Sequence, residues 1–191
     1  MNTTDDEGDV LELLRREAAQ GRQHTGDLSW HDRSPSGKSL GERGWLEALI
    51  EELKVDGVCT YMRPVACNDE WPDCEAVLTS SGEHVAVEVS EVVRGASLAP
   101  AGRPEPWTQE EFIEAVQGRI AEKDAKGFHG ELYGEYLLLL HTDELFLTAE
   151  WVTSALDRVT FELPHGNIDT AFLVLGYRRG RRAYFPLSLA S

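Results

Sequence analysis

The run from Tyr136 to Leu140 is the feature that most constrains the fold. It reads Tyr-Leu-Leu-Leu-Leu and lies within a segment, 135–141, that has the length of a strand. A strand without polar alternation buries both of its faces, and in α/β proteins helices cover those faces. The run therefore predicts a strand inside a sheet that has helices on both sides.

The rest of the chain predicts the other elements by their periodicity. Ser39 and Glu42, and again Thr108 and Glu111, have the spacing of a capping box, which marks the start of a helix. Alternating or continuous apolar runs predict strands. We predict helices over 40–54, 108–126 and 149–159, and strands over 57–62, 73–79, 84–91, 135–141, 170–177 and 183–189. The predicted fold is α/β, a central mixed β-sheet flanked by helices, in the order α-βββ-α-β-α-ββ.

The length and composition predict a single domain. A chain of 191 residues is enough for one sizeable core. Apolar residues at helical spacing predict a short helix within 9–19, and the polar stretch 21–38, with its Gly, Ser and Pro residues, reads as a linker. We therefore predict an N-terminal helix and flexible linker over 1–40 and one α/β domain over 41–191.

The charge and hydropathy of the chain limit its surroundings and partners. Its formal net charge is −16 at pH 7. Such a surface repels nucleic-acid phosphates unless positive charge gathers locally. No stretch approaches roughly 18 consecutive apolar residues, which predicts no membrane span. The acidic start lacks the basic and apolar pattern of a secretory signal, so we predict a cytoplasmic protein.

The three cysteines are Cys59, Cys67 and Cys74. Their odd number and the absence of a Cys-x-x-Cys pair argue against a disulfide framework in a chain of this length. A zinc site that joins Cys67 and Cys74 to histidines lacks the usual ligand spacing. We therefore predict that the cysteines are reduced.

Two carboxylates on a predicted hairpin carry the chemistry. Asp73 follows a proline, and Glu88 comes fifteen residues later on the strand that pairs with it. Alternation along 84–91 places the valines on one face and Glu88 on the other. Hard oxygen ligands held on strands suit Mg²⁺ or Mn²⁺. Such an ion activates water and stabilises charge on a phosphoryl oxygen.

These features resemble the PD-(D/E)XK nuclease superfamily, also called the restriction-endonuclease-like fold, over residues 41–140. The resemblance rests on a helix that carries Glu42, on the Pro-Asp pair at Asp73, on the Glu-Val-Ser run from Glu88, and on a following helix before another strand. It implies a metal held by Asp73, Glu88 and the Val89 carbonyl, with Glu42 in support.

The chain departs from this family at one position. The family's lysine, which orients or activates the attacking water, would stand at Ser90, and serine cannot supply its charge. Lys123 lies in the apolar stripe of the 108–126 helix, where a lysine is unusual unless its amine reaches a carboxylate or ligand. Some family members carry the lysine on this helix, so the resemblance implies Lys123 as the catalytic substitute. In the other reading, the Lys123 stem only covers the edge of the core.

The predicted function is hydrolysis of nucleic-acid phosphodiesters by a Mg²⁺-dependent nuclease that acts on DNA or RNA. Two alternatives stay open: a catalytically inactive nuclease-fold module that binds or regulates, and an enzyme for a small phosphorylated or sulfated metabolite. A homodimer or a protein partner is also left open. Predicted substrate contacts are Ser90, Gln117 and the basic cluster between the last two strands, Arg178, Arg179, Arg181 and Arg182.

Overall fold

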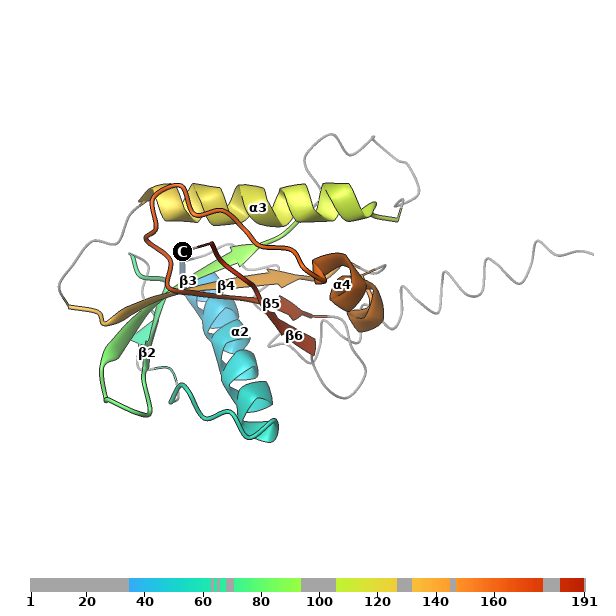
Figure 1. The fold of residues 1–191 in the computed structure, drawn as a ribbon. Helices are drawn as coiled ribbons and strands as arrows, with labels where there is room; N and C mark the ends of the chain where they lie inside the picture. Colours follow the sequence, from blue (N-terminus) through green and yellow to red (C-terminus); the bar gives the residue numbers. More distant parts are fainter. Residues whose placement is uncertain are drawn as a thin grey trace, which may run out of the picture.

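The computed structural model describes residues 35–62, 64, 66–67, 71–93, 106–126, 132–144, 147–176 and 183–190 (Figure 1). The helices within these ranges are α2 (Pro35–Val55), α3 (Gln109–Lys126) and α4 (Ala149–Leu156). The strands are β1 (Ala66–Cys67), β2 (Cys74–Val77), β3 (His84–Glu91), β4 (Glu135–Thr142), β5 (Thr170–Leu175) and β6 (Ala183–Pro186). Their order along the chain is α-βββ-α-β-α-ββ, which confirms the predicted order.

The strands form one mixed sheet in the order β1-β2-β3-β4-β5-β6. The pairs β1–β2, β2–β3 and β5–β6 are antiparallel, whereas β3–β4 and β4–β5 are parallel. The crossovers between the parallel strands carry α3 and α4, as parallel connections require. The predicted α/β class with a central mixed sheet is confirmed.

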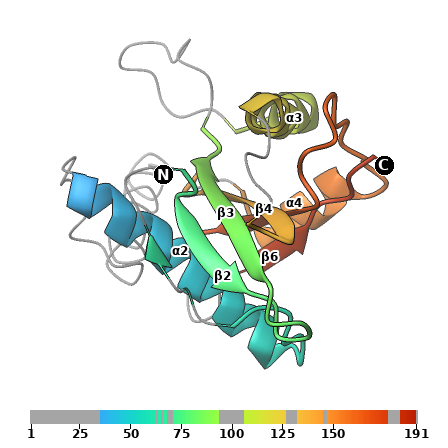
Figure 2. The same ribbon diagram turned by 90° about the vertical axis from the view of Figure 1, so that its left-hand side faces the viewer.

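Two hydrophobic cores lie on the two faces of the sheet. Helix α3 lies over one face and α2 over the other (Figures 1 and 2). Alternation along β4 sends Tyr136, Leu138 and Leu140 to the α3 face, and Leu137 and Leu139 to the α2 face. All five are fully buried, as a strand covered on both sides requires.

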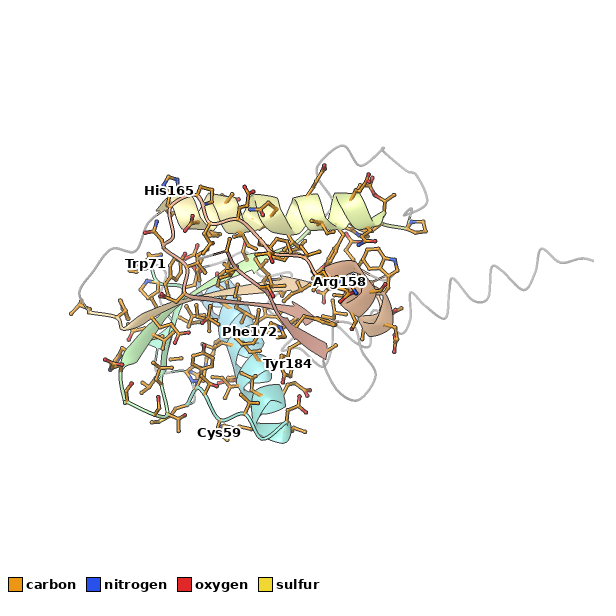
Figure 3. The ribbon with its side chains drawn as sticks, in the orientation of Figure 1. Cys59, Trp71, Arg158, His165, Phe172 and Tyr184 are labelled. Atoms are coloured by element: carbon orange, nitrogen blue, oxygen red, sulfur yellow. The ribbon has the colours of Figure 1, made fainter. Side chains whose placement is uncertain are left out.

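One side-chain contact on each face of the sheet illustrates how the layers are joined. Phe172 and Tyr184 belong to the α2 face, where their rings meet edge-on with centroids 6.2 Å apart. His165 lies beside α3, in the segment between α4 and β5 (Figure 3). Its backbone N–H donates to the Oδ2 atom of Asp124, 2.6 Å away, and this bond ties the segment to the last turn of α3.

The two capping-box predictions have different outcomes. At α3, the Thr108 backbone N–H donates to Glu111 Oε2 at 3.0 Å, and the Glu111 N–H donates to the Thr108 hydroxyl at 3.2 Å, which confirms the box. Helix α2 begins at Pro35, ahead of the predicted start near residue 40. Proline suits the first turn because the N–H it lacks has no partner there. The predicted domain boundary at residue 40 thus falls inside α2, and the division itself stays a prediction.

The first predicted strand is wrong in position. Residues 57–62 form no strand, and only Tyr61 makes an isolated bridge, to Leu78. The segment from Gly57 to Thr60 is exposed and has no face to bury. The first strand of the sheet is instead β1, Ala66–Cys67.

The cysteine prediction is wrong for Cys74, which is disulfide-bonded. Cys59 is free and exposed. The predicted N-terminal helix within 9–19 and the basic cluster Arg178, Arg179, Arg181 and Arg182 lie outside the described residues. Within the described ranges, no helix is both long and apolar enough to cross a membrane.

Candidate functional site

The β2–β3 hairpin places Asp73 and Glu88 opposite each other. Cys74 pairs with Val87, so the next position outward joins residues 73 and 88. Directly opposed residues of an antiparallel pair direct their side chains to the same face. Both side chains are buried, with Asp73 9% and Glu88 4% exposed. The two carboxylates therefore come together on one face of the sheet.

The Asp73 carboxylate is held by the neighbouring strand. Its Oδ2 atom accepts a hydrogen bond from the backbone N–H of Val89, 2.9 Å away. A buried carboxylate that accepts a backbone N–H has a fixed orientation, and one of its oxygens is satisfied. Asp73 is thus anchored one residue beyond Glu88 on β3.

Lys123 reaches Glu88 from α3. Its Nζ atom hydrogen-bonds Glu88 Oε1, and the two side chains are 10% and 6% exposed. Burial disfavours the charged amine, but the hydrogen bond and charge of Glu88 outweigh it and raise the pKa of Lys123, with a further contribution from the charge of Asp73. Lys123 is therefore protonated at neutral pH. The structure confirms that Lys123 points inward, toward a carboxylate, as predicted.

A second lysine also contacts Glu88. The Nζ atom of Lys126 lies 3.5 Å from Glu88 Oε1, and its side chain is half exposed. Lys123 and Lys126 are three residues apart, so they share one side of α3. Sequence reasoning missed Lys126, although this spacing could have pointed to it.

Tyr136 completes the buried wall beside the carboxylates, and it too was missed. Burial raises the pKa of its hydroxyl, and the charges of Glu88 and Asp73 raise it further. The phenol therefore keeps its proton. The half-buried Trp71 (Figure 3) meets the rings of Tyr133 and Tyr136 edge-on, with centroids 5.8 and 6.2 Å away. Because the charges of Glu88 and Asp73 act on Tyr136, this aromatic cluster lies near the carboxylate pair.

Glu42 does not join Asp73 and Glu88 in a group of three that could hold a metal ion. It is buried, at 8% exposure, on α2, whose core lies on the opposite face of the sheet from Glu88. Among the described residues, no three His, Cys, Asp or Glu side chains form a group that could hold a metal ion. The carboxylate set at this site is therefore the pair Asp73 and Glu88.

The remaining predicted contacts are spread over the fold. Ser90 is half-buried and has the parity of Glu88 on β3. Gln117 faces the segment before β5: its amide donates to the Glu162 carbonyl at 3.0 Å and accepts from the Glu162 N–H at 2.9 Å. Both polar groups of Gln117 are thus used inside the protein, and it is not brought to the carboxylate pair.

Comparison with known proteins does not assign a family. No protein-family model matches the chain, and no curated protein matches it. Among solved structures, the chain is similar to SfsA of Pyrococcus furiosus in complex with Ca²⁺, with 12% sequence identity and a TM-score of 0.34. The match covers 76% of this chain and 62% of the SfsA chain, so this chain spans about 62% of that protein's length.

Proposed function

We propose that Asp73, Glu88 and Lys123 form the site of a divalent-metal-dependent phosphodiesterase that resembles the PD-(D/E)XK nucleases. The contact between Lys123 and Glu88 carries the proposal. It brings an amine from α3 to the face that Asp73 and Glu88 share, where Ser90 supplies no charge. The restriction-endonuclease-like assignment of the fold is part of the same proposal and is supported by the α-βββ-α-β order.

The residues present fit a small, hard cation. Mg²⁺ prefers carboxylate oxygens, and proteins often hold it with one or two carboxylates while it keeps several waters. Asp73 and Glu88 supply two such groups, and Val89, between Glu88 and Ser90, donates its N–H to Asp73. When bound, Mg²⁺ or Mn²⁺ would supply Lewis-acid stabilisation of charge on the phosphoryl oxygens.

Lys123 would act in the site through its positive charge. Because its pKa is raised, it carries a positive charge at neutral pH and cannot accept the proton of an attacking water. Its charge can orient that water and offset negative charge that develops on the phosphate. Glu88 holds the amine in place, since the two side chains are buried against each other.

A non-catalytic binding module with the same fold is the second candidate. Two observations favour it: the net charge of −16, and the pairing of Glu88 with both Lys123 and Lys126. In that case the lysines would balance the carboxylates without any metal. An enzyme for a small phosphorylated or sulfated metabolite would use the same carboxylate pair.

Thermal unfolding with and without Mn²⁺ separates these functions. Binding to the folded state should raise the melting temperature by roughly 5–10 °C at a metal concentration of about 100 times Kd. Asp73→Asn should abolish the shift while keeping an oxygen for the Val89 N–H. Asp157→Asn, at the C-cap residue that follows α4 and has a side chain 71% exposed, is the charge-matched control and should keep the shift.

Cleavage assays complete the test. The phosphodiesterase proposal predicts Mn²⁺-dependent cleavage of single-stranded or duplex oligonucleotides, lost in Asp73→Asn and retained in Asp157→Asn. A melting shift without cleavage would select the binding module or a small-metabolite enzyme. A melting temperature that is the same with and without Mn²⁺ would refute the metal site.

A further inference from the structure

Glu88 is shared by two lysines that differ in exposure. Lys123 hydrogen-bonds Glu88 Oε1, and its side chain is 10% exposed. Lys126 lies 3.5 Å from the same oxygen, and its side chain is 50% exposed. A ligand from solvent can therefore reach the Lys126 amine, whereas the Lys123 amine is covered.

Lys126 can leave Glu88 at little cost. Its distance of 3.5 Å is longer than a normal charge-assisted hydrogen bond. A half-exposed ion pair of this kind contributes little to stability. Glu88 keeps its hydrogen bond with Lys123 when Lys126 moves, so no buried carboxylate is left unpaired.

The other basic side chains of α3 are paired with carboxylates. Within this helix, Arg119 pairs with Glu122 at 2.8 Å, and Lys123 is held on Glu88. The chain as a whole carries −16. A phosphate that approaches the two carboxylates must therefore find local positive charge, and on α3 the accessible amine is that of Lys126.

We infer that Lys126 binds the phosphate group of the substrate, while Lys123 stays on Glu88. A lysine ammonium is a compact point charge that suits a phosphate oxygen. The inference rests on the proposed function for the role of the neighbouring carboxylates. The two lysines therefore have different roles. Lys123 acts within the site, and Lys126 binds an anion that approaches from solvent.

Binding of a fluorescein-labelled single-stranded oligonucleotide tests this role in the full chain. Lys126→Gln should lower the affinity on the order of fivefold and reduce the salt dependence by about one phosphate contact. Lys54→Gln, at an exposed lysine of α2 on the other side of the sheet, changes the net charge equally and should alter neither quantity. Both variants should melt like the wild type, because both lysines are exposed. Lys126→Arg should restore much of the affinity.

The same protein samples also distinguish a nucleic-acid phosphate from a small phosphorylated ligand. They further separate a failure of this inference from a failure of the proposed metal site. Inorganic phosphate that raises the melting temperature of the wild type but not of Lys126→Gln, without oligonucleotide binding, would support a small phosphorylated ligand. Equal affinities of Lys126→Gln and Lys54→Gln for the oligonucleotide, with no phosphate effect in either, would overturn the inference and leave Lys126 as a partner of the α3 C-terminus. The Mn²⁺ melting shift reports on Asp73 and Glu88 separately, so a failure there is distinguished from a failure here.

Discussion

The amine of Lys123 donates a hydrogen bond to the carboxylate of Glu88 and joins α3 to β3 across 35 residues of sequence. Both side chains are nearly covered. Removing one member of a buried ion pair leaves an uncompensated charge, which costs far more than the pair itself contributes. The contact therefore determines both the stability of this region and the chemistry proposed for it.

Lys123→Met is expected to lower the free energy of unfolding by roughly 3 kcal/mol, because Glu88 would lose its close partner. Urea denaturation measures this. The double variant Lys123→Met with Glu88→Gln should be more stable than Lys123→Met alone, since no buried charge remains. Arg119→Met, which removes the exposed pair with Glu122, is the control and should cost about 0.5 kcal/mol. Equal losses in Lys123→Met and Arg119→Met would contradict the buried pair.

His141 predicts a pH dependence of stability. Its ring stacks on Trp45, with centroids 4.4 Å apart and an interplanar angle of 15°. Burial lowers the pKa of His141 from 6.5 to about 3. Between these values the unfolded chain binds more protons than the folded one. The contribution of His141 is therefore fully present above about pH 6.5 and is lost as the pH falls toward 3.

The expected loss is on the order of 1 kcal/mol for each pH unit within that window. Urea denaturation at several pH values measures the slope for the wild type and for His141→Phe, which keeps a ring against Trp45. The variant should show a smaller slope. Identical slopes would mean that another group causes the acid sensitivity.

Gly176 is required by its neighbours. A Cβ atom at this position would lie 1.8 Å from Asp143 Oδ1 and 2.5 Å from the Trp45 ring. Gly176→Ala should therefore destabilise the protein by about 1–3 kcal/mol, the usual cost of overpacking. Gly118→Ala is the matched control, because nothing lies within 4 Å of its Cβ position in the middle of α3. That variant should gain about 0.5–1 kcal/mol. A Gly176→Ala protein as stable as the wild type would show that the Asp143 side chain moves away freely.

Gln117 is expected to affect stability and not binding. Its amide makes two hydrogen bonds with the Glu162 backbone. Gln117→Ala should lower the free energy of unfolding by about 1–2 kcal/mol. Oligonucleotide affinity, measured beside Lys126→Gln, should stay at the wild-type value. A loss of affinity without a loss of stability would restore the predicted substrate contact.

Local patterns predicted much of the fold. Strand β3 has the bounds predicted for 84–91, because alternation and the turn before it are set by residues close in sequence. The capping box of Thr108 and Glu111 predicted the start of α3 for the same reason. The prediction for 57–62 failed because an apolar run becomes a strand only where a neighbour covers it, and such cover depends on long-range packing.

The sequence by itself determined which face of β3 carries Glu88 and that Lys123 falls in the apolar stripe of α3, since the periods of strand and helix follow from backbone geometry. Tertiary structure alone decided that these two side chains meet, that Lys126 joins them, and that Glu42 forms no three-ligand metal group with Asp73 and Glu88. Those relationships depend on the crossover that lays α3 over one face of the sheet and α2 over the other. No local period contains that information, because it arises only when segments distant in the chain bury their apolar faces together.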